Sequence, residues 1–342
     1  MQLSHRTATL RLAEPFTISR STSVEEPVVW VELRHERVSG FGEAQPQEHY
    51  GESVESARAF LDQAGPLVGD DPFAFEAIGR RLAALPGEQA GRAALDAALH
   101  DLCGKLVGRP VWKLLGLEAA GPPTSWTIWL GDPDDMARRA EAADARFHRL
   151  KLKLGGRDGL DVERVRAVRG VTRLPLQVDV NEYWEVEEAL ENVGVLAELG
   201  VEYVEQPLPA GDPGGPRLKA ASPLPIYVDE DCLTLADVAA CAERAHGINI
   251  KLTKSGGIRE AIRMAHAARA LGIGVMLGCM IESGLGIAAA CQVASLCDHV
   301  DLDGNILLAE DPWPGVELRD GVQVPSADPG LGVHEQATAD PR

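Results

Sequence analysis

Several short apolar stretches in the middle of the chain end in a charged residue. In order along the chain, these residues are Lys153, Asp179, Glu205, Asp229 and Lys251. Successive positions are roughly two dozen residues apart, which is the length of one strand, one helix and their loops. Because a charged group is costly to bury without a partner, lysines and carboxylates at such strand ends indicate a metal site flanked by bases.

The three carboxylates indicate which metal this is. Asp179, Glu205 and Asp229 would end three consecutive strands and would meet at one edge of the sheet. One aspartate at a strand end is usually a helix cap or a solvent contact, but three carboxylates together repel one another unless a cation lies between them. Hard oxygen ligands with room for water and substrate suit Mg²⁺. We predict one Mg²⁺ per subunit at these residues.

The lysines indicate proton transfer. Lys151 and Lys153 are two residues apart on one strand and share a face, whereas Lys251 ends a strand on the opposite side of the expected mouth. Two bases facing one carbon atom from opposite sides can remove an α-proton and return it with inverted configuration. Lysine ordinarily has a pKa of about 10.4, and burial beside a divalent cation would lower it toward about 7–8. Lys254 competes as the second base, but the strand register favours Lys251 because Lys254 is expected on a loop.

From Thr124 onward, strand-like and helix-like segments alternate along the chain, and these are the elements that must position the charged residues. Short apolar strands are followed by amphipathic helical patterns, which favours parallel βα units. No strand is followed by a GxGxxG loop, since the glycines of Ser255-Gly256-Gly257 are adjacent, so an α/β barrel fits better than a doubly wound sheet. The expected strands are 125–130, 148–153, 175–180, 201–205, 225–229, 247–251, 272–277 and 299–303, and the clearest helices are 161–169, 185–199, 235–245, 257–271 and 285–296.

The first part of the chain has a different pattern. Residues 1–46 alternate apolar and polar side chains in places, which indicates antiparallel strands with one buried face. Helical patterns follow near 52–64, 71–85 and 88–107. The predicted divisions are an α+β capping domain over 1–115 with lid loops near 19–26 and 46–53, a barrel over 116–306, a segment over 307–333 that returns to the capping domain, and a disordered end over 334–342.

The composition excludes several classes of protein. The 342 residues carry a formal net charge of −19 at pH 7, which disfavours nucleic acids and anionic membranes as partners because both require basic patches. The six cysteines are scattered without a CxxC pair, so reduced thiols are expected and a zinc site is not. No apolar stretch reaches about 18 residues and the N-terminus lacks a signal peptide's apolar region, so we predict a cytoplasmic protein.

These motifs together resemble the enolase superfamily, in its muconate-lactonizing subgroup. The resemblance implies a capping domain on a modified (β/α)₇β TIM-type barrel, Mg²⁺ as the cofactor, and Lys153 and Lys251 as the acid and base, with Lys151 assisting electrostatically. It covers nearly the whole chain, and the ordered set is far more specific than any one motif. The matching runs are Lys151-Leu152-Lys153, Asp179-Val180-Asn181, Glu205-Gln206-Pro207, Asp229-Glu230-Asp231 and Ile248-Asn249-Ile250-Lys251.

Further motifs resemble the dipeptide epimerases of this subgroup. The Asp301-Leu302-Asp303 run is similar to the paired aspartates that hold the substrate's α-ammonium group, and such carboxylates can bind an ammonium through charge-assisted hydrogen bonds. The Met280-Ile281-Glu282-Ser283 run is similar to another epimerase segment, which implies that Glu282 binds substrate. Arg20 and Tyr50 resemble the lid residues of L-Ala-D/L-Glu epimerases, and Arg20 could pair with a glutamate side chain.

Two departures from this pattern bear on the substrate's side chains. The lids also carry Glu25, Glu26, Glu48 and His49, which could favour a different side chain. In addition, Glu182-Tyr183-Trp184 stands where Gln-Gly-Trp is more usual after the asparagine.

The expected function is Mg²⁺-dependent epimerisation at the α-carbon of the C-terminal residue of a dipeptide. An Ala-Glu type substrate of murein peptide metabolism is favoured, and a homo-oligomer remains open. The alternatives are an o-succinylbenzoate synthase with N-acylamino-acid racemase activity, a muconate-type cycloisomerase and, more remotely, a non-catalytic barrel. The first two act on substrates without a free ammonium group, which sets them apart from a dipeptide epimerase.

Overall fold

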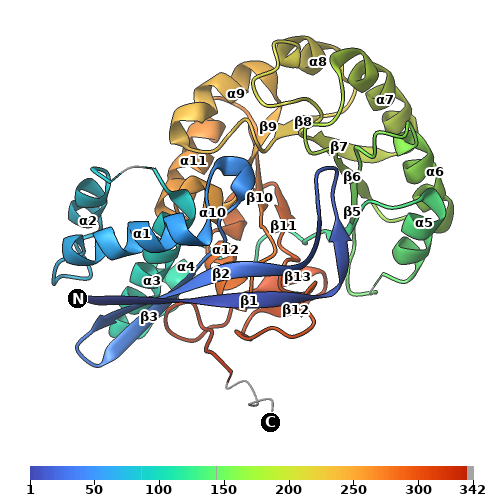
Figure 1. Cartoon of the computed structure of the whole chain (residues 1–342). Helices are drawn as coiled ribbons and strands as arrows, with labels where there is room; N and C mark the ends of the chain where they lie inside the picture. Colours follow the sequence, from blue (N-terminus) through green and yellow to red (C-terminus); the bar gives the residue numbers. More distant parts are fainter. Residues whose placement is uncertain (86, 144, 337–342) are drawn as a thin grey trace.

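The computed structural model describes residues 1–85, 87–143 and 145–336. The disordered end predicted for 334–342 lies, from residue 337 onward, outside the described residues. Figure 1 shows an antiparallel sheet with helices formed by the start of the chain, beside a ring of strands surrounded by helices. Within the described residues, no helix combines the length and the apolar character that crossing a membrane requires.

The capping unit is built on a three-stranded antiparallel sheet in the order β1-β2-β3. Val29, Val31 and Leu33 alternate along β2 and share a core with Leu95 and Leu102 of α3. Val28 and Trp30 on the other face pack into the core shared with the barrel, so both faces of β2 are buried here and not one face as predicted. The elements of this unit are β1 (Gln2–Thr17), β2 (Thr22–His35), β3 (Val38–Ala44), η1 (Glu48–Tyr50), α1 (Val54–Ala64), η2 (Gly65–Leu67), α2 (Phe75–Leu82), α3 (Gln89–Val107) and α4 (Val111–Leu114).

Glycines allow β3 to lie directly on the backbone of α3. A Cβ atom added to Gly42 would lie 2.0 Å from the carbonyl oxygen of Ala94, and one added to Gly40 would lie 2.1 Å from that of Ala98. Because both neighbours are helical backbone, they cannot rotate away as a side chain could. The close contact of strand and helix therefore depends on these two glycines.

We expect Gly42→Ala to destabilise the protein by about 1–3 kcal/mol or more, since overpacking forces the strand away from the helix. Gly194→Ala is the matched control, because this glycine lies in a helix and an added Cβ meets nothing within 4 Å. The control should be neutral or stabilising by up to about 1 kcal/mol. Urea unfolding of both variants measures the difference, and a Gly42→Ala variant as stable as the control would contradict this packing argument.

The second unit is a parallel barrel, which confirms the predicted fold class. The sheet runs in the order β11-β10-β9-β8-β7-β6-β5-β4, and its open edges meet where Thr124 bridges to Val300. The strands are β4 (Trp126–Ile128), β5 (Leu150–Lys153), β6 (Leu176–Asp179), β7 (Val201–Glu205), β8 (Ile226–Val228), β9 (Gly247–Ile250), β10 (Gly274–Gly278) and β11 (His299–Asp301).

Helices between the strands surround the barrel in Figure 1. The sequence predictions found the long ones and missed α5, α8 and α10, which are short or rich in polar residues. The helices are α5 (Pro133–Glu141), α6 (Asp161–Val171), α7 (Val186–Glu198), α8 (Gly215–Ala221), η3 (Leu235–Asp237), α9 (Val238–Arg244), α10 (Leu252–Ser255), α11 (Ile258–Ala270), α12 (Gly284–Cys291) and η4 (Ala294–Leu296).

The chain returns to the capping unit after β11. A short hairpin forms first, from β12 (Glu317–Arg319) and β13 (Val322–Val324). The buried carboxylate of Asp101 in α3 then accepts hydrogen bonds from the backbone N–H groups of Leu331 (2.8 Å) and Phe41 (2.8 Å). This side chain therefore joins the C-terminal segment to the capping sheet and helix.

A hairpin of the capping sheet extends over the barrel. The tip of β1 and β2 is a tight turn in which Ile18 N–H donates to the carbonyl of Ser21 (2.9 Å). Strand β2 begins at Thr22, so most of the segment expected as a loop over 19–26 is strand, because Thr22 and Ser23 pair with Thr17 and Phe16. The second lid segment contains η1, which ends at Gly51, and the φ of 75° at this residue favours glycine.

Candidate active site

The register of the parallel strands brings the charged strand ends together. Lys153 of β5 is paired with Asp179 of β6, and Asp179 is paired with Glu205 of β7. Asp229 follows β8 and Lys251 follows β9. Because parallel strands in register end at one edge, all five side chains reach the same end of the barrel.

Buried ion pairs connect these groups. The Lys153 Nζ lies 2.6 Å from Asp179, and the Lys251 Nζ lies 2.7 Å from Asp229. The Lys151 Nζ contacts Glu205 at 2.7 Å. The three carboxylate residues are 0% exposed, so their charges depend on one another and on cations rather than on water.

The three carboxylates fit a hard divalent cation. Glu205 Oε2 and both carboxylate oxygens of Asp229 accept no well-aligned hydrogen bond from the described residues, although lysine ammonium groups lie within ion-pair distance. Burial, and next the charge of Asp179, raise the pKa of Glu205 despite Lys151. Mg²⁺ binds oxygen ligands that are free of other donors. The unbonded oxygens of Glu205 and Asp229 meet this requirement, and the negative charge of Glu205 is not fully balanced by the neighbouring lysines.

The other two carboxyls have the opposite shift. Burial alone would raise the pKa of Asp179, but Lys153 and Lys151 hold it at about 2. The pKa of Asp229 is also lowered, because Lys251 and Lys254 outweigh the effect of burial. Both groups are therefore carboxylates at neutral pH, as ligands of a metal must be.

The amide side chain of Gln206 positions this site, and sequence reasoning did not assign it a role. Its Oε1 accepts from Asp229 N–H (2.8 Å), and its Nε2 donates to the carbonyl of Leu208 (2.8 Å) and to Asp231 (2.9 Å). Gln206 has a φ of 35°, an unusual value for a residue with a side chain. Its place directly after Glu205 was the available signal.

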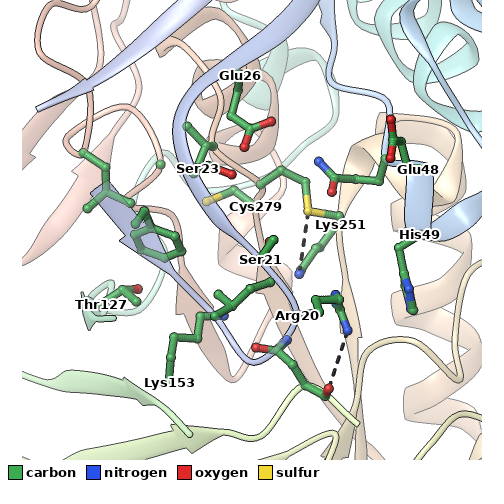
Figure 2. A pocket seen from close by; sticks show the side chains of 18 of the residues that line it. Arg20, Ser21, Ser23, Glu26, Glu48, His49, Thr127, Lys153, Lys251 and Cys279 are labelled. Atoms are coloured by element: carbon green, nitrogen blue, oxygen red, sulfur yellow. Dashed lines mark hydrogen bonds between the residues drawn. The ribbon is translucent and has the colours of Figure 1, made fainter. Parts of the chain in front are cut away.

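Lys153 and Lys251 approach one cavity from different walls, as Figure 2 shows. Burial disfavours the charged form of Lys251, but Asp229 and Glu205 outweigh this and raise its pKa. A divalent cation shared by these carboxylates would compete with the ammonium group for the same oxygens and would shift the pKa downward.

Lys254 lies behind the site and not on a loop as expected. It is 2% exposed within the single turn of α10, 2.6 Å from Asp229 Oδ1. Its Nζ also donates to the carbonyl oxygens of Asp229 (2.6 Å) and Cys232 (2.8 Å). Since Lys254 does not line the cavity and Lys251 does, the geometry favours Lys251 as the second base.

The cavity lies between the capping unit and the barrel and has a volume of about 480 Å³. This volume is suited to a small molecule. Its walls come from the lid hairpin, the second lid segment and the ends of the strands. The polar residues of the wall include Arg20, Glu26, Glu48, His49, Tyr50, Thr127, Lys153, Lys251, Asp301 and Asp303.

The two aspartates after β11 form one wall. Asp301 Oδ2 accepts from the Lys151 Nζ (2.6 Å), while Asp301 Oδ1 accepts no hydrogen bond from the described residues. Asp303 accepts from Thr127 N–H (2.7 Å), and burial together with Asp301 raises its pKa to about 7. The pair therefore has acceptor capacity directed at the cavity, as an ammonium group would need.

The remaining predicted substrate residues have different surroundings. Arg20 and Tyr50 line the cavity, but Arg20 is paired with protein carboxylates, 2.5 Å from Glu230 and 3.2 Å from Glu182. Glu282 is not in the cavity wall. It is buried at the boundary of the two units beside Glu43, and burial and Glu43 raise its pKa to about 8.

Comparison with known proteins places these features in a family. Residues 2–116 match the mandelate racemase / muconate lactonizing enzyme N-terminal domain, and residues 135–338 match the enolase C-terminal domain-like family. The L-Ala-D/L-Glu epimerase of Bacteroides thetaiotaomicron is 40% identical over 95% of this chain and 85% of its own length.

Solved structures give the same result. A substrate-liganded L-Ala-D/L-Glu epimerase from Bacillus subtilis superposes with a TM-score of 0.93 at 29% identity, covering 98% of this chain and 99% of that one. A dipeptide epimerase from Enterococcus faecalis, complexed with Mg and L-Leu-L-Tyr, has a TM-score of 0.92 at 30% identity, with 97% and 98% covered.

Proposed function

The chain belongs to the mandelate racemase and muconate lactonizing enzyme family of the enolase superfamily, and from this premise we propose that it is a Mg²⁺-dependent dipeptide epimerase. The reaction is inversion of the α-carbon in the C-terminal residue of the dipeptide. The observation that carries the proposal is the pair of lysines, Lys153 and Lys251, in different walls of one cavity beside three buried carboxylates.

Asp179, Glu205 and Asp229 would hold the Mg²⁺. When bound, the ion supplies positive charge that stabilises the negative charge developing on the substrate carboxylate as the α-proton leaves. Lys153 and Lys251 perform the two proton transfers. The lysine on the side of the α-proton acts in its neutral form as the base, and the opposite lysine donates a proton from its ammonium group.

The other charged groups orient the dipeptide. Lys151, held among three carboxylates, keeps positive charge next to the reacting end. Asp301 Oδ1 and the carboxyl of Asp303 hold the α-ammonium group of the N-terminal residue. This arrangement fixes both ends of a short peptide and leaves the α-carbon between the lysines.

We expect Asp301→Asn combined with Asp303→Asn to reduce kcat/KM for L-Ala-L-Glu by roughly 150-fold or more, because two charged hydrogen bonds are weakened. Each hydrogen bond to a charged group contributes about 1.5–3 kcal/mol, and the ammonium would lose its counter-charge. Steady-state kinetics on the dipeptide and on its N-acetyl derivative, which has no ammonium group, measure the effect. An N-acylamino-acid racemase or a cycloisomerase would lose little activity on its own substrates, because these have no ammonium group. An unchanged rate on the dipeptide would contradict the assignment of Asp301 and Asp303 to the ammonium group.

A deuterium-exchange screen tests the reaction itself. Dipeptide libraries incubated with the protein and Mg²⁺ in D₂O should gain one mass unit wherever an α-proton is exchanged, and mass spectrometry identifies the dipeptides. Exchange in at least one dipeptide, absent without protein, is the expected result. No exchange in any dipeptide would favour a different substrate class or a non-catalytic barrel.

Ala-Glu dipeptides are the proposed substrates, because similar proteins from Bacteroides thetaiotaomicron and Bacillus subtilis are L-Ala-D/L-Glu epimerases. Such dipeptides arise from murein peptides, which suggests a role in their metabolism. A cytoplasmic location is part of the proposal, since six free cysteines suit a reducing compartment. The proposed partner is the small dipeptide, and neither a nucleic acid nor a membrane is part of the proposal. Analytical ultracentrifugation measures whether the chain associates with itself.

A further inference from the structure

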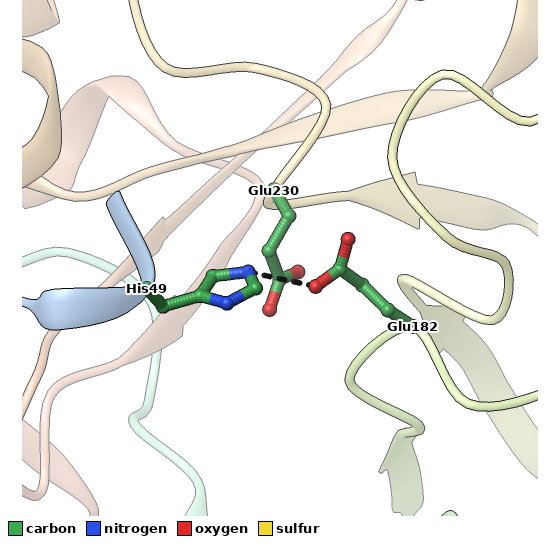
Figure 3. A group of neighbouring side chains, drawn as sticks. All are labelled: His49, Glu182 and Glu230. Carbon is green, nitrogen blue, oxygen red and sulfur yellow. Dashed lines mark ion pairs between the residues drawn. The ribbon is translucent and has the colours of Figure 1, made fainter. Parts of the chain in front are cut away.

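Arg20 at the tip of the lid hairpin is surrounded by carboxylates of the protein itself. One terminal nitrogen of its guanidinium lies 2.5 Å from Glu230 and the other lies 3.2 Å from Glu182. His49 of the second lid segment is 2.8 Å from the same Glu182 oxygen. Figure 3 shows the imidazole and the two carboxylates converging from three separate segments of the chain.

The backbone around Glu182 directs its carboxylate at the lids. Asn181 and Glu182 have φ values of 49° and 73°, a left-handed conformation that is unfavourable for residues with side chains. Glu182 Oε1 accepts from Ala210 N–H (2.9 Å), which leaves Oε2 for Arg20 and His49. The carboxylate is thus fixed by the barrel and presented to both lid segments.

The positively charged guanidinium of Arg20 already lies between the two carboxylates of this cluster. His49, Glu182 and Glu230 offer ligand atoms within 4.8 Å of one another, which resembles a metal site. However, the Arg20 guanidinium bonds to both glutamates, and a metal ion would have to displace it. The cluster is therefore better described as a binding site for the Arg20 guanidinium at the edge of the substrate cavity, whose wall includes Arg20 and His49.

We propose that Glu182 is a specificity-determining residue that competes with the substrate for Arg20. This inference rests on the proposed dipeptide epimerase function. An acidic side chain in the second residue of the dipeptide can pair with Arg20 only beside the carboxylates of Glu182 and Glu230, and like charges at such distances repel. An uncharged amide side chain of the same shape avoids this repulsion. Glu182 therefore weakens the preference for acidic over amide side chains.

The test is Glu182→Gln. Glutamine has nearly the same shape and can still accept the hydrogen bond from Ala210, but it carries no charge. The ratio of kcat/KM for L-Ala-L-Glu to that for L-Ala-L-Gln should rise by about tenfold in the variant, chiefly through a lower KM for L-Ala-L-Glu. A residue with only a structural role would change both substrates alike and leave the ratio constant.

The control is Glu187→Gln, which removes the same charge from an exposed residue of α7 that pairs with Arg217. It should leave the ratio unchanged. If Glu182→Gln does not fold, Glu182→Asp provides the same test, because the shorter side chain draws the carboxylate away from Arg20. The ratio of kcat/KM values should then rise by a smaller factor. An active Glu182→Gln enzyme with an unchanged or lower ratio overturns this inference alone. Failure of the wild-type protein to exchange any dipeptide overturns the proposed function instead.

Discussion

Lys153→Met is expected to reduce kcat for epimerisation by about 10²–10⁴-fold, and Lys251→Met by a similar factor. Removal of a positioned acid or base costs a rate of this size, and inversion requires both groups. The two variants should differ in which epimer they still deprotonate. With one lysine left, only the epimer whose α-proton faces that lysine can exchange it with solvent.

NMR of the α-proton in D₂O measures this selectivity for L-Ala-L-Glu and L-Ala-D-Glu separately. Lys113→Met, at an exposed position in α4, is the control and should exchange both epimers. Lys254→Met should show no selectivity between epimers, because that lysine lies behind Asp229. If Lys153→Met exchanged both epimers at the wild-type rate, the two-base assignment would be wrong.

Removal of divalent cations is expected to reduce activity by at least about 10³-fold, and Mg²⁺ should restore it. The buried lysines are already paired with the carboxylates of the protein, so without the ion little positive charge is left to stabilise the charge that develops on the substrate. Mg²⁺ at 100 times its Kd should also stabilise the fold by about 2.7 kcal/mol. Thermal unfolding with a chelator and with added Mg²⁺ measures this shift independently of catalysis.

Asp229→Asn should abolish both effects of Mg²⁺. The variant should also be less stable without the ion by about 3–5 kcal/mol, because Lys251 and Lys254 would lose their shared counter-charge while remaining buried. Asp134→Asn, at an exposed position in the first turn of α5, is the control and should respond to Mg²⁺ as the wild type does. A normal Mg²⁺ response in Asp229→Asn would show that the ion binds elsewhere.

The sequence predicted the barrel well because each strand combines a short apolar run with a charged residue at its end. That pattern holds for β6 and β7, whose ends Asp179 and Glu205 are paired in register. The α5 helix was missed because most of its residues are polar and only Met136 and Ala140 are buried. The α8 helix was missed because seven residues are too few for a clear pattern. Residues of the segment 19–26 line the cavity, but the segment was predicted as a loop, because its strand pairing depends on a partner strand and not on local composition.

The part of the site that would face the side chain of the dipeptide's second residue could not be predicted in the same way. Arg20, Glu182 and Glu230 come from segments far apart in the chain, and their contacts depend on the left-handed backbone at Asn181 and Glu182. Tertiary structure imposes that conformation, and no local rule for non-glycine residues predicts it. The position of Lys254 was misjudged for a related reason, because a one-turn helix directly after a strand leaves almost no periodic signal.

The lid hairpin is held to the barrel both along β1 and at its tip, and this bears on how the hairpin could open. The β1–β2 register shifts between Arg11 and Phe16, and at that point Ala13 N–H bonds to the Leu307 carbonyl (2.9 Å) and Ala309 N–H to the Arg11 carbonyl (2.9 Å). Beyond this clamp, the Thr17 carbonyl accepts a hydrogen bond from Leu130 N–H (2.9 Å), and the tip is tied to the barrel by polar contacts of Ser19 and Arg20. Because the clamp lies between these contacts and the rest of the capping sheet, breaking them alone would free the tip, and the other pairing of the sheet would be kept during exchange of substrate and product.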